Sequence, residues 1–163
     1  MNEDTSLPPD EVLETPAPAL TADEAENVAR ELFGIRGQVR QLDSERDQNF
    51  RLTSENGDQY VLKIANPAEN AEVIDLQARA LSWIARTDPD LPVPRIQSTR
   101  EGQQSGSIAI GSRNCIVRAV SYLDGALLDE VTPTVALGQS LGTSLARMDI
   151  ALQGFFHHGA GHE

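Results

Sequence analysis

The segment Tyr60–Ile64 places the only lysine of the chain inside a run that is otherwise aromatic, β-branched and apolar. The preceding pair Asn56-Gly57 suits a tight hairpin turn, so the run is predicted to form a buried strand. Burying an ammonium group costs free energy unless the group is paired or holds an anion. Lys63 is therefore a candidate phosphate ligand, and the alternative is a lysine that extends into water from a strand edge.

The balance of charge argues against nucleic acid and anionic lipid as partners. The 163 residues include 25 acidic and 13 basic side chains, for a net charge of −12. Nucleic acid and anionic membranes both require a basic face. Nine of the acidic residues lie in residues 1–31, so the rest of the chain is only mildly acidic. Residues 1–19 also contain four prolines, and this composition predicts a disordered lead.

Other features favour a soluble cytoplasmic protein. Cys115 is the only cysteine, which excludes an intramolecular disulfide and fits a reducing compartment. The first residues have neither the basic start nor the apolar centre of a signal peptide. No apolar run approaches the length of about 18 residues that a membrane helix requires.

The element order predicts an α+β lobe. A capping box formed by Thr21 and Glu24 starts a helix that Gly34 closes. Three strands in a meander, a helix and two further strands follow, which indicates a five-stranded antiparallel sheet with a packed helix. The predicted ranges are 21–33 and 69–86 for the helices and 35–42, 48–54 and 60–65 for the meander, with later strand-like runs at 95–100, 108–110 and 115–122.

A last helix is predicted over residues 133–155. Its apolar side chains fall on one stripe at helical spacing. If this stripe is only partly covered, it is expected to promote self-association. The stripe consists of Leu137, Leu141, Leu145, Met148 and Leu152.

Five stretches resemble the small lobe of the aminoglycoside phosphotransferase and choline kinase family, which has a protein-kinase-like fold. Within that family the chain is most similar to hydroxylysine kinases and to phosphotransferase domains fused to class III aminotransferases. The resemblance implies a nucleotide-binding lobe over residues 20–125, then a hinge exit and the first helix of a large lobe over residues 126–163. The stretches are YVLKIANPAEN, DLQARALSWIA, DLPVPRI, IVRAVSYLDG and LGTSLARMDIALQGFFH.

The resemblance also implies roles for single residues. Lys63 matches the lysine that holds the α- and β-phosphates of ATP, and Ser44 and Asn49 match the loop over the phosphates. Ala119 and Tyr122, with Val120 between them, match the hinge against the adenine. Gln77 aligns with the glutamate that pairs with the lysine in kinases. Ordinary loop polarity and simple strand packing are the competing interpretations of the loop and hinge residues.

The residues that carry out phosphoryl transfer lie, in this family, in a larger second lobe. The chain ends at Glu163, so no catalytic residue is assigned and the chain alone is expected to be inactive. ATP and magnesium are expected as cofactors of a complete kinase, with a C-terminal lobe or an aminotransferase region as partner. The alternative is a non-catalytic nucleotide-binding or regulatory lobe. His157, His158 and His162 are noted as metal-ligand types, but no metal site is predicted there.

Overall fold

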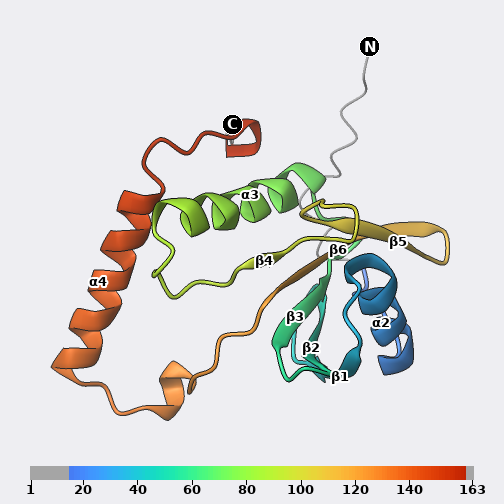
Figure 1. Cartoon of the computed structure of the whole chain (residues 1–163), viewed down its shortest axis with the longest axis horizontal. Helices are drawn as coiled ribbons and strands as arrows, with labels where there is room; N and C mark the ends of the chain where they lie inside the picture. The colour runs from blue at the N-terminus through green and yellow to red at the C-terminus, as the bar shows by residue number, and fades with distance from the viewer. Residues whose placement is uncertain (1–14, 161–163) are drawn as a thin grey trace.

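The computed structural model describes residues 15–160, which form one antiparallel sheet between helices (Figure 1). The predicted disorder of residues 1–19 falls mainly on residues 1–14, which lie outside the described part. The helical elements are α2 (Ala22–Val28), the π-helical turn η1 (Ala29–Phe33), α3 (Ala71–Thr87), the 3₁₀ turn η2 (Leu128–Glu130), α4 (Val135–Ala151) and the 3₁₀ turn η3 (His158–Ala160). The strands are β1 (Gly37–Leu42), β2 (Gln48–Ser54), β3 (Gln59–Ile64), β4 (Ile96–Gln97), β5 (Gly106–Ile110) and β6 (Arg113–Ser121).

The sheet has the order β1-β2-β3-β6-β4, with β5 also paired to β6 and every pair antiparallel. The predicted α+β class and kinase-like lobe are confirmed, and the sheet has six strands where five were predicted. The strand-like run predicted at residues 95–100 is reduced to β4, which is only two residues long. A turn begins at Thr99, whose N–H donates to the Gln103 carbonyl at 2.8 Å, so the chain leaves β6 after the first part of residues 95–100.

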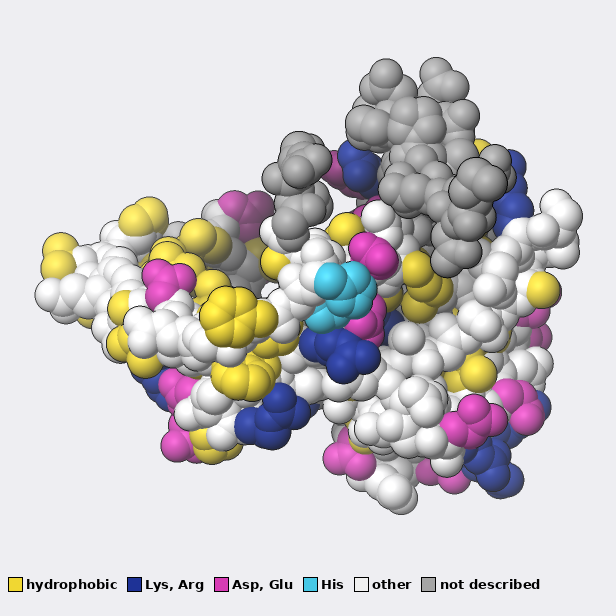
Figure 2. Space-filling view, turned by 90° about the horizontal axis from the view of Figure 1, so that it is seen from above, with side chains coloured by type: hydrophobic (Ala, Val, Ile, Leu, Met, Phe, Trp, Pro, Cys, Tyr) yellow, Lys and Arg dark blue, Asp and Glu magenta, His cyan; other side chains and the backbone are white. Residues whose placement is uncertain are grey.

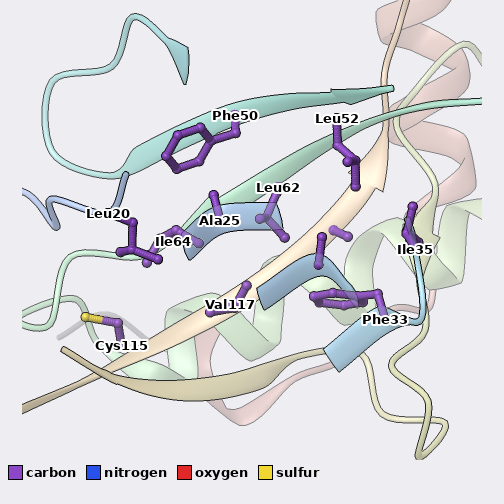
Figure 3. Packing of buried hydrophobic residues seen from close by; sticks show 12 residues of the cluster. Leu20, Ala25, Phe33, Ile35, Phe50, Leu52, Leu62, Ile64, Cys115 and Val117 are labelled. Carbon is purple, nitrogen blue, oxygen red and sulfur yellow. The ribbon is translucent and has the colours of Figure 1, made fainter. Parts of the chain in front are cut away.

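One face of the sheet packs against α2 and η1. The capping box at Thr21 is present, and Gly34 ends the helical segment with a φ of 70°, a conformation that favours glycine. Figure 3 shows the resulting core, in which Phe33 belongs to one cluster with side chains from β2, β3 and β6. Alternate residues of these strands point into this core, which explains the burial of Phe50, Leu62 and Ala119.

The helix α3 lies over the opposite face of the sheet (Figure 1). It begins at Ala71 because residues 66–69 form a turn, in which the Glu69 N–H donates to the Asn66 carbonyl at 2.9 Å. The Asn70 side chain then caps the helix by accepting from the Glu72 N–H at 2.8 Å. The first half of α3 therefore lies next to the strand side chains that point away from the α2 core, including Lys63.

The last helix, α4, contacts α3 only near its own C-terminal end (Figure 1). There, Trp83 Nε1 donates to the Ala151 carbonyl at 2.8 Å, and Arg147 forms two hydrogen bonds with Asp88. Leu141 and Leu145 of the predicted stripe are 50% and 49% exposed, as expected for a partly covered helix. Hydrophobic side chains accordingly gather on the surface at the α4 side of the molecule (Figure 2).

Candidate functional site

A row of polar side chains crosses the centre of the sheet on the face below α3. Asn49 of β2 is opposite Lys63 of β3, and Lys63 is opposite Arg118 of β6. Residues directly opposite each other in antiparallel strands project from the same face, with Cβ atoms about 5 Å apart. The row therefore brings an amide and two cations together in the middle of a sheet whose other face is apolar.

This row forms the floor of a cavity of about 400 Å³. The β1–β2 loop covers one side of the cavity, and α3 covers the other. Three acidic and three basic side chains line it, so the charges of the lining balance. The lining consists of Ser44, Glu45, Arg46, Asp47, Asn49, Lys63, Ala65, Glu69, Ile74, Gln77 and Arg118.

Lys63 is paired with the loop and not with α3. Its Nζ lies 3.8 Å from Asp47 Oδ2, and the two side chains are 31% and 23% exposed. The other oxygen, Asp47 Oδ1, accepts a hydrogen bond of 3.2 Å from the Asn66 N–H. The loop thus places a carboxylate where an anionic ligand of Lys63 would bind.

Arg118 is the cation that α3 contacts. Its Nη1 donates to Gln77 Oε1 at 3.0 Å and to the Ile74 carbonyl at 3.4 Å. The residue is only 6% exposed. Burial lowers the pKa of Arg118, while the charges of Asp47 and Glu69 act in the opposite direction. The group still carries its charge, because an arginine in a protein is not deprotonated near neutral pH.

Hydrogen bonds from Asn66 hold the β1–β2 loop in place. Its side chain accepts from the Ala68 N–H at 3.0 Å and donates to the carbonyls of Arg46 and Thr15 at 3.4 and 3.0 Å. Within the loop, Ser44 Oγ donates to the Asp47 carbonyl. Asn66 is 2% exposed, so these bonds form out of water, where they are difficult to replace. The sequence marks this position only as the end of a strand.

Four of the six predicted site residues line the same cavity: Ser44, Asn49, Lys63 and Gln77. Ala119 and Tyr122 are not part of its lining. The Ala119 side chain is fully buried in the core beneath α2. The Tyr122 N–H donates to the Gln59 carbonyl at 2.9 Å, and its ring lies 4.2 Å from the Arg51 guanidinium carbon. A hinge role for this segment, through its backbone, stays a prediction.

Arg118 is a site residue that the sequence analysis did not single out, although a signal exists. It is a lone charge inside the otherwise apolar run of residues 115–120, as Lys63 is inside its own strand. Applying the same argument to both strands identifies both cations.

The histidines near the end of the chain contact α3 outside this cavity. His157 Nε2 lies 2.9 Å from Asp75 Oδ2, and the Gly159 N–H donates to His157 Nδ1 at 3.0 Å. His158 Nε2 lies 3.6 Å from Glu72 Oε1. Between residues 15 and 160 no group of three or more His, Cys, Asp or Glu side chains is arranged to hold a metal ion. His162 lies outside the described residues.

Fold and cavity together define a kinase-like small lobe, with its lysine on the third strand of the sheet and a helix packed beside it. The profile of the phosphotransferase enzyme family matches residues 38–161, which is most of the chain. The chain therefore belongs to the phosphotransferase enzyme family. No helix within residues 15–160 has the length and apolar character needed to cross a membrane.

Comparison with known proteins agrees with this assignment. Hydroxylysine kinase of Danio rerio is 29% identical over an alignment of 142 residues that covers 83% of this chain and 39% of the relative. Hydroxylysine kinase of Mus musculus is 27% identical over 154 residues, covering 86% of this chain and 40% of the relative. The chain thus spans about two fifths of the length of these relatives.

Solved structures show the same fold. An amicoumacin kinase in complex with AMP-PNP, Ca²⁺ and its ligand superposes with a TM-score of 0.68 at 18% identity, covering 93% of this chain and 44% of that one. A microcompartment-associated aminopropanol kinase superposes with a TM-score of 0.65 at 18% identity, covering 88% and 44%. In both cases this chain corresponds to less than half of the kinase.

Proposed function

We propose that this chain is the N-terminal, ATP-binding portion of a small-molecule kinase. The observation that carries the proposal is the position of Lys63, the only lysine, in a cavity that also contains Ser44, Asn49 and Gln77. A lysine on a central strand, with a polar loop on one side and a helix on the other, suits binding of nucleotide phosphates. In this proposal residues 20–125 form the nucleotide-binding lobe, and residues 126–163 lead into a second lobe.

The substrate class follows from the relatives. Proteins named for hydroxylysine and aminopropanol phosphorylation act on compounds that bear both an amine and a hydroxyl group. We therefore propose ATP-dependent phosphorylation of a hydroxyl group on an amine-bearing small molecule. Magnesium would accompany ATP and shield the charge of its phosphates, and Lys63 would hold the phosphate oxygens.

Turnover in this proposal depends on residues beyond those of this chain. Phosphoryl transfer needs a side chain that positions the acceptor hydroxyl and side chains that hold the metal ions. The matched relatives are about two and a half times as long as the part that this chain covers, since coverage is 39–40%. A C-terminal lobe, alone or with an aminotransferase region, would supply these groups.

A second candidate is a lobe that binds nucleotide without catalysis. Two observations favour it: Gln77, which the resemblance aligns with the kinase glutamate, accepts from Arg118 and not from Lys63, and Asp47 is the ion-pair partner of Lys63. Such a lobe would bind ATP weakly and would remain without turnover even when joined to a second lobe.

Calorimetric titration of the chain with ATP and magnesium tests nucleotide binding, which both candidate functions require. We expect weak binding and no release of ADP from the chain alone in the presence of amino alcohols. Joining the chain to the large lobe of a related kinase then separates the two candidates. ADP release that depends on an amino alcohol supports the kinase, and binding without release supports the non-catalytic lobe. No binding of ATP by the chain would contradict both.

A further inference from the structure

Arg118 projects into the cavity from the strand next to Lys63. The two residues are opposite each other in the β3–β6 register, so their side chains leave the same face of the sheet. Both line the cavity below α3. Any anion that reaches Lys63 therefore also comes close to a second full positive charge.

Arg118 has no carboxylate partner in the described part of the chain. Hydrogen bonds from residues 15–160 engage only its Nη1, through the neutral acceptors Gln77 Oε1 and the Ile74 carbonyl. Asp47 and Glu69 act on it only at a distance, and Asp47 is the ion-pair partner of Lys63. A guanidinium that is 6% exposed with no direct counter-ion is costly, unless an anion completes the site.

The residue at position 77 determines whether the Arg118 guanidinium remains available to bind an anion. A glutamate there would form an ion pair with Arg118, since Gln77 Oε1 already lies 3.0 Å from Nη1. The amide orients the guanidinium without neutralising it. The remaining donors, Nε and Nη2, have no hydrogen-bond partner among residues 15–160, so a phosphate can accept from them in the paired geometry that arginine provides.

Resting on the proposed nucleotide site, we propose that Arg118 is a second phosphate-binding residue, which contacts the nucleotide polyphosphate together with Lys63 while Gln77 holds it in position. In kinases, a lysine held by a glutamate binds the phosphates. In this chain, the charge of Arg118 on β6 provides part of that anion binding. Asn49, whose Oδ1 is buried without a hydrogen-bond partner in residues 15–160, completes the row on the other side of Lys63.

The test compares three ligands by calorimetry: ATP with magnesium, inorganic triphosphate and adenosine. Arg118→Met replaces the guanidinium by an apolar side chain, and Arg118→Lys keeps a charge without the paired donors. Arg113→Met is the matched control, because Arg113 is an exposed arginine on the same strand, away from the cavity. Thermal unfolding of every variant establishes that the proteins compared are folded.

We expect Arg118→Met to weaken ATP and triphosphate about ten-fold or more, the loss typical of a charge-assisted hydrogen bond. Arg118→Lys should fall between Arg118→Met and the wild type. Adenosine binding should not change, and Arg113→Met should bind all three ligands as the wild type does. If Arg118 has only a structural role, its replacement should lower the melting temperature and leave the preference for the phosphate-bearing ligands unchanged. That result would overturn the inference.

Gln77→Glu provides a second test that removes no side chain. We expect it to weaken triphosphate binding in the wild-type background and to have a much smaller effect in the Arg118→Met background, because its target is then absent. Equal effects in the two backgrounds would contradict the positioning role of Gln77. If the wild type binds triphosphate through Arg118 but shows no preference for ATP, the anion site stands and the nucleotide function fails. If it binds none of the ligands, both fail.

Discussion

Asp47 supplies the counter-ion of Lys63, with 3.8 Å between Oδ2 and Nζ, and it comes from the loop between β1 and β2, whereas Lys63 lies on β3. The helix α3 contributes no carboxylate to this pair, and its Gln77 side chain accepts from Arg118. The charge network of the cavity is therefore rearranged relative to the lysine–glutamate pair of kinases. Two cations are held separately, one by a loop carboxylate and one by neutral acceptors.

Replacing Lys63 by alanine should weaken ATP binding about ten-fold or more, since a hydrogen bond to a charged group contributes about 1.5–3 kcal/mol. Calorimetric titration with ATP and magnesium measures the effect. Arg113→Ala, which removes an exposed charge on β6, is the control for the change in net charge. Equal affinity of wild type and Lys63→Ala, with binding clearly measurable, would remove Lys63 from the site.

Replacing Asp47 by asparagine should strengthen ATP binding. The substitution removes the carboxylate that competes with phosphate for Lys63, while the amide oxygen can still accept from the Asn66 N–H. The pair is partly exposed, so the gain is limited to about two- to five-fold, in line with the small free energy of such ion pairs. Asp43→Asn, in the same loop but exposed and outside the cavity lining, is the control. A loss of affinity in Asp47→Asn would indicate that the carboxylate assists the ligand.

The sequence predicts the sheet and the position of the lysine, because both depend on local patterns. Alternation of apolar residues along β2 and β3 defines which face is buried, and the capping box at Thr21 marks a helix start. The partners inside the cavity could not be predicted in this way. The pairing of Lys63 with Asp47 and of Arg118 with Gln77 depends on strand register and on how α3 lies over the sheet, which are tertiary properties.

The contact between α4 and the rest of the lobe should weaken in acid. Hydrogen bonding to Arg147 outweighs the effect of burial and lowers the pKa of Asp88 below its ordinary value of 3.8. A carboxyl group with a lowered pKa stabilises the folded state above the pKa of the unfolded chain. This contribution is lost as the pH falls through the lower folded value. The helix should therefore stay docked near neutral pH and loosen below about pH 4.

Trp83 provides the measurement of this change, since it is the only tryptophan and donates to the α4 carbonyl of Ala151. Its fluorescence should change in acid before the sheet unfolds, as followed by far-ultraviolet circular dichroism. Arg147→Met should show the changed fluorescence already at neutral pH and no separate acid step. An acid step of the same size in Arg147→Met would assign the transition to other carboxylates.

The chain should self-associate through α4 when it is studied alone. Leu141 and Leu145 are half exposed on one stripe of the helix, and Val135 and Ile150 are 80% and 64% exposed. A second copy can cover the stripe that carries Leu141 and Leu145, and burial of apolar surface contributes about 25 cal/mol for each Å² removed from water. Sedimentation velocity over a range of concentrations should show dimers or larger species.

The double substitution Leu141→Gln and Leu145→Gln should shift the protein toward monomer. Gln139→Ala and Ser140→Ala, two exposed polar positions on the same helix, should not. A wild type that stays monomeric at high concentration would contradict this prediction.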